Sequence, residues 1–410
     1  MTPAALSRRD LARVGGGALL AAAAPRPAAA KSAKWPYLMG ADVSWIPEDE
    51  AVGATYWQDG VRRDPLAILR DAGFNAIKLR QFVDPARGYS AGKPGGPWCD
   101  VARNIDFARR IRAADMHLSL TLHYSDTWAD PEHQDKPAAW ADLSFGKLVD
   151  AVHRHTVDSL SAMKLAGVAP DMIVIGNETT FGMLWPEGRI PAALPTGNPV
   201  TDSRHRQSGQ PGAHDRYAAL LSAGLAAARD TVPDATLVLH NHLGRHWGIV
   251  QDWMDNLLRR DVRFDSIGLS CYQQQAQGDW ERCFAQFMDR YPDHGLIVLE
   301  YSSRKRYLND LVRALPRGQG SFIWEPTRHQ EAMFLKNGVS AGEGPRPDLL
   351  AQGINAAEAP GSTPDPAAAS TPRPPRDHGG RYDADPAFLN LYRTMATDYG
   401  LTVGTGMARP

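Results

Sequence analysis

Cysteines are scarce in this sequence, and their spacing does not predict a metal site. The 410 residues include three cysteines, Cys99, Cys271 and Cys283, and no two of them have the Cys-x-x-Cys spacing that is typical of zinc sites. Because three is an odd number, at most one disulfide can form. Cys271 and Cys283 are the candidates for that pair, and two buried free thiols are the alternative. We expect neither a metal nor a cofactor.

The sequence also lacks a strong charge of either sign and a long apolar run. It has 45 lysines and arginines and 46 aspartates and glutamates, a net charge of -1, which excludes the excess positive charge that nucleic-acid-binding proteins need. The mean hydropathy is -0.38, and no apolar run is long enough to span a bilayer. We therefore expect a water-soluble mature protein that binds neither nucleic acid nor a membrane.

The N-terminus has the pattern of an export signal. Residues 7–11 (SRRDL) precede a weakly apolar stretch at 14–24, and three alanines at 28–30 form a small-residue cleavage site before Lys31. This order resembles a bacterial twin-arginine signal, and a disordered arm is the alternative. We expect residues 1–30 to be removed and the mature protein to be periplasmic or extracellular.

Apolar runs of strand length alternate with segments of helical period, which predicts parallel βαβ units. We predict an α/β protein with one (β/α)8 TIM barrel that spans residues 31–410 as a single catalytic domain. The eight expected strands lie near 38–44, 75–82, 116–124, 171–178, 235–242, 264–272, 295–301 and 320–325. The clearest helical patterns lie at 64–72, 101–114, 145–166, 214–230, 247–260, 279–290, 305–314 and 386–399.

Residues 341–380 depart from this alternation because they are rich in Pro, Ala, Gly and Ser. Such a composition buries too little apolar surface to order itself, so we expect a long mobile loop after the eighth strand. A domain boundary is the alternative. The thirty residues that follow are too few for a domain and fit a last barrel helix better.

Polar side chains close every predicted strand. The carboxyl ends of parallel barrel strands share one face, where the active sites of such barrels form. One polar ending is unremarkable, but eight of them predict a site. The residues concerned are Asp42, Arg80, His123, Asn177, Glu178, His240, Tyr272, Glu300, Trp324 and Glu325.

Glu178 and Glu300 close strands four and seven, which lie across the barrel mouth from each other. Retaining glycosidases need two carboxyl groups about 5 to 5.5 Å apart, one attacking the anomeric carbon and one protonating the leaving oxygen. We predict Glu300 as the nucleophile and Glu178 as the acid/base. Arg80 is the expected cation beside Glu300. The alternative for each glutamate alone is a solvated cap or a salt-bridge partner.

The other polar endings have expected roles around this pair. Asn177 is expected to donate to the sugar 2-hydroxyl, and Tyr272 to hydrogen-bond Glu300. His123 and His240 either contact substrate or are hydrogen-bonded residues of the mouth, and neither has the H-x-x-x-H spacing of a metal ligand pair. Four tryptophans are either sugar platforms or core aromatics: Trp128, Trp140, Trp185 and Trp324.

Several motifs resemble glycoside hydrolase family 53, the arabinogalactan endo-β-1,4-galactanases. They are HYSDTWADP at 123–131 with KPAAW at 136–140, GADVSW at 40–45, IGNE at 175–178 with GMLWP at 182–186, FDSIGLS at 264–270, and WEP at 324–326. The resemblance implies a clan A barrel that cuts β-1,4-galactan, a side chain of pectin, internally and with retention. It matches Glu178 and Glu300 to the catalytic pair. We also expect Asp42, Asp126 and Trp128 to bind substrate.

Two segments depart from this family's usual pattern, which affects the expected substrate. Tyr272 is followed by three glutamines instead of an aromatic-proline cluster, and Glu300 is followed by YSSRK at 301–305. No acidic cluster corresponds to the calcium site of some members. The expected partner is the polysaccharide, and we expect a monomer. A clan A hydrolase of another β-linked glycan and a non-catalytic sugar-binding barrel are the alternatives.

Overall fold

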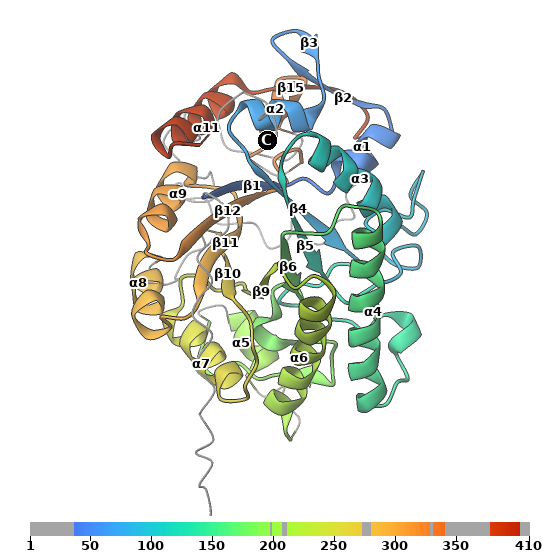
Figure 1. The fold of residues 1–410 in the computed structure, drawn as a ribbon, viewed down its shortest axis with the longest axis vertical. Coiled ribbons are helices and arrows are strands. Elements are labelled where there is room, and N and C mark those ends of the chain that lie inside the picture. The colour runs from blue at the N-terminus through green and yellow to red at the C-terminus, as the bar shows by residue number, and fades with distance from the viewer. Residues whose placement is uncertain are drawn as a thin grey trace, which may run out of the picture.

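Eight parallel strands close into the predicted barrel (Figure 1). The computed structural model describes residues 37–196, 199–206, 211–272, 280–328, 331–340 and 378–401. The expected export signal at 1–30 and residues 341–377 of the expected loop lie outside these ranges. In their order around the barrel, the strands are β1 (Leu38–Asp42), β12 (Gly318–Trp324), β11 (Gly295–Tyr301), β10 (Ser266–Ser270), β9 (Thr236–Asn241), β6 (Met172–Ile175), β5 (His117–Leu122) and β4 (Ala76–Gln81).

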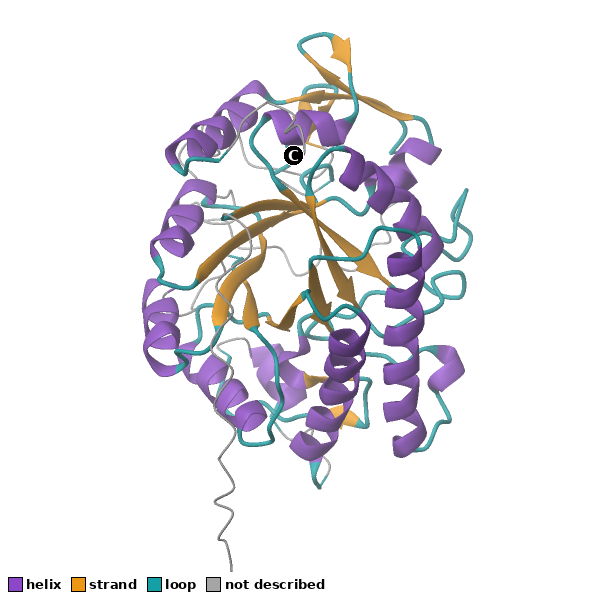
Figure 2. Ribbon diagram, viewed as in Figure 1, coloured by secondary structure: helices purple, strands orange, loops and turns teal. Residues whose placement is uncertain are grey.

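All eight helical patterns are confirmed, and their helices surround the barrel (Figure 2). Three of them begin at an aspartate whose side chain accepts a backbone N–H: Asp64, Asp100 and Asp385. This cap satisfies an amide that would otherwise lack a partner at the helix start. The helices are α2 (Pro65–Asp71), α3 (Val101–Ala113), α4 (Phe145–Leu165), α6 (Ala213–Thr231), α7 (Trp247–Leu258), α8 (Trp280–Arg290), α9 (Lys305–Ala314) and α11 (Pro386–Asp398).

The barrel interior has an apolar layer below its polar mouth. Because alternate strand residues face inward, six of the eight strands contribute one or two side chains each to this layer. Phe322 fills the space over Gly40, where an added Cβ would lie 2.3 Å from the ring. The layer closes the lower half of the barrel and confines polar chemistry to the mouth. Its members are Leu38, Ala76, Met172, Val174, Val238, Ile297, Leu299 and Phe322.

A second sheet was not predicted. It contains five short strands, β14 (Val339–Ser340), β13 (Phe334–Lys336), β15 (Gly380–Ala384), β2 (Ala54–Gln58) and β3 (Val61–Arg62), in this order. It lies at the top of Figure 1, where β15 pairs in parallel with β2. Strands of two to five residues have too few alternations for a periodic pattern, and the pairing of β15 with β2 joins segments that are far apart in the sequence.

Other short elements were also missed. They are α1 (Ile46–Ala51), α5 (Pro199–His205), the 3-10 helices η1 (Ala138–Trp140) and η2 (Thr179–Phe181), and the ribbon of β7 (Gly182–Met183) with β8 (Gly188–Arg189). All of them lie in loops that follow the carboxyl ends of barrel strands. These loops therefore build the walls of the mouth, which helps to position the candidate site.

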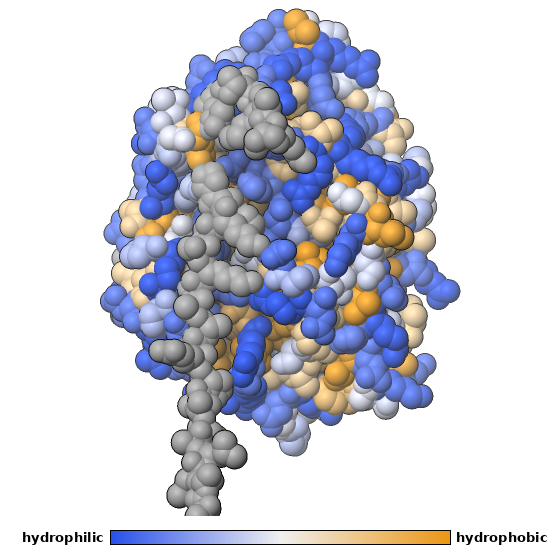
Figure 3. All heavy atoms as spheres, viewed as in Figure 1, coloured by the Kyte–Doolittle hydropathy of each residue, from blue (hydrophilic) through white to orange (hydrophobic). Residues whose placement is uncertain are grey.

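The visible surface is mainly hydrophilic, and the three cysteines are buried. In the view of Figure 3, hydrophilic residues cover most of the visible face and the hydrophobic ones form small separate patches. None of the helices in the described ranges combines the length and apolarity needed to cross a bilayer. Cys99, Cys271 and Cys283 are buried free thiols, so the alternative of a Cys271–Cys283 disulfide is wrong. The monomeric state stays a prediction.

Candidate active site

A β-bulge turns Glu300 into the barrel mouth. Between β10 and β11 the register shifts at Leu269, so that Ser270 lies opposite Glu300 instead of Leu299. Leu299 belongs to the apolar layer inside the barrel, and strict alternation would turn the next residue toward the helices. The inserted residue re-aims that side chain, as bulges beside active sites do. Glu300 consequently faces the mouth, and Tyr301 faces outward to Tyr392 of α11.

A tight turn after β6 positions Glu178. Gly176 has φ of +77°, and a Cβ there would lie 2.5 Å from Thr179 Cγ2, so the turn requires glycine. Glu178 itself has the left-handed backbone angles φ 47° and ψ 47°. Non-glycine residues rarely adopt this conformation, and such strain concentrates at functional sites. The turn directs Glu178 toward β10 and β11.

Glu178 is buried in surroundings that favour its protonated form. Ser270 Oγ donates to Glu178 Oε1 at 2.5 Å. Burial and the nearby charge of Glu300 raise the pKa of Glu178 to about 8, although the Ser270 hydrogen bond acts in the opposite direction. A carboxyl group with this pKa is protonated at neutral pH, as a general acid must be.

Glu300 has two direct partners. Lys78 Nζ donates to Glu300 Oε1 at 3.0 Å, and Tyr272 OH donates to Oε2 at 3.2 Å. The expected hydrogen bond from Tyr272 is therefore present. The prediction that Arg80 is the cation beside Glu300 was wrong. Lys78 supplies the positive charge, and it lies two residues before Arg80 on β4, facing the same way. Lys78 also lies 3.3 Å from Asp42 Oδ2. Burial lowers its pKa, but Glu300 and Asp42 raise it more, so the net shift is upward.

Arg80 instead forms a buried ion pair with Glu325 at the end of β12 and lies 3.7 Å from Asp42 Oδ1. Its guanidinium carbon is 4.3 Å from the centroid of Trp128 and 4.9 Å from that of Trp45. A guanidinium at these distances interacts favourably with aromatic rings. Arg80 thus joins β4 to β1, to β12 and to the aromatic wall of the mouth.

Asn177 and His240 form a hydrogen-bonded chain beneath Glu178. His240 Nε2 is 2.9 Å from Ser270 Oγ, and its Nδ1 is 3.1 Å from Asn177 Oδ1. The Asn177 amide also donates to Ala129 O at 2.8 Å. Burial lowers the pKa of His240 well below its usual value, as does the charge of Lys78. A neutral His240 therefore orients Ser270, and through it Glu178.

His123 and Asp126 fix the loop that follows β5. His123 Nδ1 accepts from Ala129 N at 3.1 Å, and burial, followed by Arg80 and Lys78, lowers its pKa well below the usual value. Asp126 accepts the backbone N–H groups of Asp84 and Ala138, one on each carboxylate oxygen. Both residues hold mouth loops in place. Direct contact of either residue with substrate stays a prediction.

Three tryptophans form one aromatic wall. The ring centroids of Trp45 and Trp324 are 5.5 Å apart, those of Trp45 and Trp128 are 5.9 Å apart, and all three side chains are half-buried. Trp140 is buried in the main hydrophobic core, so it is a core aromatic. Trp185 is half-buried in a separate loop and packs on His205. Trp128 and Trp324 therefore remain candidate platforms for the apolar face of a sugar.

Sequence reasoning missed Lys78, Ser270 and Trp45. Lys78 had a signal, because a lysine inside an otherwise apolar strand, two positions before Arg80, must face the same side as Arg80. Ser270 had none, since a serine in a buried strand is common. Within the described ranges, no group of three or more His, Cys, Asp or Glu side chains is arranged to hold a metal ion.

Comparison with known proteins identifies the family of this chain. The sequence profile of glycosyl hydrolase family 53 matches residues 38–310, which include both glutamates. The chain belongs to glycosyl hydrolase family 53. A solved family 53 catalytic domain from Ignisphaera aggregans superposes with a TM-score of 0.59 and 29% identity, covering 77% of this chain and 91% of that one. The (β/α)8 barrel is thus the fold of its family.

Two sequence relatives define the extent of the match. A protein of Niallia circulans, described as an uncharacterized protein in the bgaB 5' region, is 35% identical over 237 residues, which are 58% of this chain and 59% of that protein. An arabinogalactan endo-beta-1,4-galactanase of Thermothelomyces thermophilus is 30% identical over 322 residues, which are 70% of this chain and 88% of that enzyme. The match thus spans about three fifths of the first relative and most of the second.

Proposed function

We propose that this family 53 protein is a retaining endo-β-1,4-galactanase that cuts the galactan side chains of pectin. The observation that supports it most is that two carboxyl groups with different surroundings lie in the same barrel mouth. Glu178 has a pKa of about 8, whereas Glu300 contacts the ammonium group of Lys78. Environments that separate two carboxyl groups in this way identify the acid and the nucleophile. The similarity to the Thermothelomyces thermophilus galactanase supports the choice of substrate.

The proposed reaction has two displacements. The Glu300 carboxylate attacks the anomeric carbon while the bond to the leaving oxygen breaks, and Glu178 gives its proton to that oxygen. Glu178, now ionised, removes a proton from water, and the resulting nucleophile displaces Glu300 from the anomeric carbon. Lys78 and Tyr272 stabilise the charge that returns to Glu300. Asn177 is proposed to bind the sugar 2-hydroxyl, with Trp128 and Trp324 against the ring.

We also propose that the protein is exported by the signal at residues 1–30 and acts outside the cytoplasm as a monomer. A polymeric substrate is too large to enter a cell, so an enzyme of this kind must meet it outside. Size-exclusion chromatography of the mature chain tests the monomeric state. Fractionation of cells that express the full chain and a variant with Arg8 and Arg9 replaced by lysine tests the export signal.

A product assay tests the activity. The mature protein should release reducing ends from lupin or potato galactan, but not from xylan or cellulose. Glu300→Ala should abolish turnover and remain folded, because a mouth carboxylate adds little to core packing. Glu178→Ala should keep more activity on aryl glycosides with good leaving groups, which need no protonation. Binding of galactan without any release of reducing ends would contradict the proposal and favour a sugar-binding barrel.

A hydrolase of another β-linked glycan is the second candidate. It is favoured by the sequences of the segments after Tyr272 and Glu300, which differ from the usual family pattern. Release of reducing ends from xylan or cellulose, with galactan left intact, would support it.

A further inference from the structure

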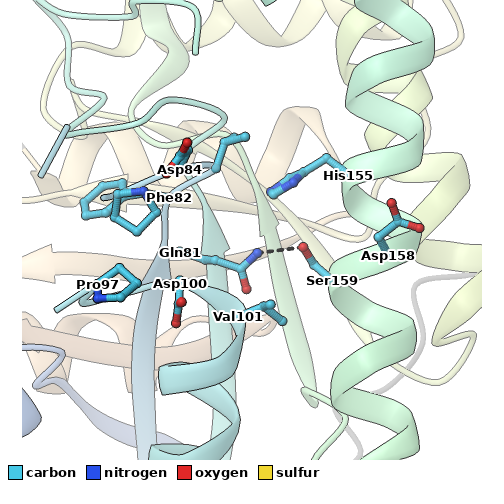
Figure 4. Close-up of a pocket in the computed structure, with 11 residues that line it drawn as sticks. Gln81, Phe82, Asp84, Pro97, Asp100, Val101, His155, Asp158 and Ser159 are labelled. Carbon is cyan, nitrogen blue, oxygen red and sulfur yellow. Dashed lines mark hydrogen bonds between the residues drawn. The ribbon is translucent and has the colours of Figure 1, made fainter. Parts of the chain in front are cut away.

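A pocket of about 310 Å³ opens on the outside of the barrel, away from the two glutamates (Figure 4). It lies between the end of β4, the start of α3 and the middle of α4. Its lining comprises residues 81–85, Pro97, Asp100 and Val101, together with three side chains of α4. Figure 4 shows Gln81 and Ser159 meeting across the pocket, with the His155 ring above them.

Two buried polar atoms in this pocket lack a hydrogen-bond partner among the described residues. Gln81 is 1% exposed; its Nε2 donates to Ser159 Oγ at 2.7 Å, but its Oε1 has no partner. His155 Nε2 is likewise buried and unpartnered. Buried polar groups are nearly always paired, so each of these two atoms can take one more hydrogen bond. Here they offer an amide oxygen and an imidazole nitrogen to one small molecule.

The lining determines which chemistry fits. It includes no lysine or arginine, so an anion would find no charge partner. Burial lowers the pKa of His155 to about 4, so its ring is neutral at neutral pH. Asp84 and Asp100 add carboxylates that accept hydrogen bonds from hydroxyl groups. Val83, Pro97 and Val101, all half-buried, add apolar surface. A neutral, hydroxyl-rich ring with an apolar face, such as a pyranose, meets all of these conditions.

The pocket and the mouth share a wall. Phe82 lines the pocket, and its ring centroid is 5.7 Å from that of Trp128 and 5.0 Å from that of His123. Both of those residues lie on the mouth side of Phe82. A sugar unit in the pocket would therefore lie directly behind the aromatic wall of the candidate active site.

We propose that this pocket is a second sugar-binding site, which takes one neutral pyranose unit of a polysaccharide and anchors the polymer beside the mouth. The choice of ligand rests on the proposed function, because a glycan hydrolase is the protein that would meet such chains. The site requires no contact with Glu178 or Glu300. Its occupancy is thus measurable without turnover.

The direct test uses the full mature chain with Glu300→Gln, which prevents hydrolysis. The imidazole signals of ¹⁵N-histidine-labelled protein are followed during titration with β-1,4-galactobiose, and the loss of one signal in His155→Phe assigns His155. We expect the His155 signal to shift and to saturate. A His155 signal that does not move while signals of mouth histidines do would overturn the proposal.

The second test measures the effect on polymer binding. Val101→Trp fills the pocket from α3, and Asp150→Ala on the exposed face of α4 is the matched control. On the Glu300→Gln background, retention in galactan gels should fall roughly tenfold for Val101→Trp, since one of two linked sites is lost, and should not change for Asp150→Ala. On the active background, kcat/KM for a short aryl galactoside should be unchanged. Equal retention of all variants would overturn the proposal.

The two proposals fail in different ways. If galactan is not hydrolysed but the His155 signal shifts with the sugar, the second site stands and the proposed function falls. If galactan is hydrolysed and neither the His155 signal nor gel retention responds, the proposed function stands and the second site falls.

Discussion

Glu178 and Ser270 together determine when the general acid is charged. Because burial and Glu300 raise the pKa of Glu178 to about 8, the carboxyl group keeps its proton throughout the neutral range. We predict that kcat/KM falls as the pH rises above about 8, where the general acid loses its proton. Ser270→Ala removes the hydrogen bond that stabilises the carboxylate, so the pKa should rise and the alkaline limb should move to higher pH.

The measurement is the pH profile of kcat/KM on an aryl glycoside whose leaving group requires protonation. Thr231→Ala, at the far end of α6, is a control that should not move the limb. An alkaline limb that stays in place, or moves to lower pH, in Ser270→Ala would contradict the assignment of Glu178.

Lys78, and not the predicted Arg80, is the cation beside Glu300. Lys78→Met removes the positive charge at 3.0 Å from Glu300, and we predict a loss of roughly 10²-fold in kcat, as for other lost electrostatic contacts in active sites. Lys78→Arg should retain more activity because it keeps the charge. Steady-state kinetics on galactan measures both variants.

Lys147 on the exposed face of α4 is the matched control, and Lys147→Met should leave kcat unchanged. Thermal melting of each variant separates a catalytic defect from loss of the fold, because Lys78 is buried among carboxylates. A folded Lys78→Met variant with normal kcat would show that Glu300 needs no cation beside it.

At the scale of the element, strand bulges and helix caps place the side chains. The register shift between β10 and β11 exposes Glu300 to the mouth, and the short turn after β6 does the same for Glu178. Three other helices, α2, α3 and α11, begin at an aspartate cap. Each cap fixes where its helix starts, and therefore how the helix packs on the barrel.

The cap of α11 gives a stability prediction. Asp385 accepts the backbone N–H of Ala387 at 2.8 Å, so Asp385→Ala should lower the free energy of unfolding by about 1 kcal/mol. Urea unfolding measures this change. Asp398 lies at the opposite end of the same helix, where a negative charge is unfavourable to the helix dipole. Asp398→Ala should therefore have a smaller effect, and equal losses would show that the cap contributes nothing.

At the scale of the whole molecule, the apolar layer joins strands from both halves of the chain. Phe322 is fully buried inside the barrel, and its truncation leaves a cavity that the surrounding strands cannot close. We predict that Phe322→Ala lowers the free energy of unfolding by roughly 3 to 5 kcal/mol. Denaturant unfolding, followed by tryptophan fluorescence, measures this change.

Val61 is a suitable control for Phe322, because it is apolar and 60% exposed on β3. Val61→Ala should change the free energy of unfolding by less than about 0.5 kcal/mol. A Phe322→Ala variant as stable as Val61→Ala would mean that the barrel interior collapses around the missing ring.

The sequence alone determined the barrel and its catalytic candidates. Alternating strand and helix patterns are local, so they predicted all eight barrel strands and their helices to within a few residues. A motif such as IGNE at 175–178 is also a local feature of the sequence. It therefore identified both Glu178 as a candidate and the family. The five-stranded second sheet escaped prediction because its strands are short and one of its pairings, β15 with β2, joins segments more than 300 residues apart in the chain.

Only the tertiary structure decided which charged groups face each other across the mouth. Lys78 and Arg80 lie on the same face of one strand, and nothing in their spacing says which of them meets Glu300. The bulge in β11 and the position of Glu325 on β12 assign Lys78 to Glu300 and Arg80 to Glu325. Pairing across a barrel depends on the register of strands that are distant in sequence, and a local pattern contains no information on that register.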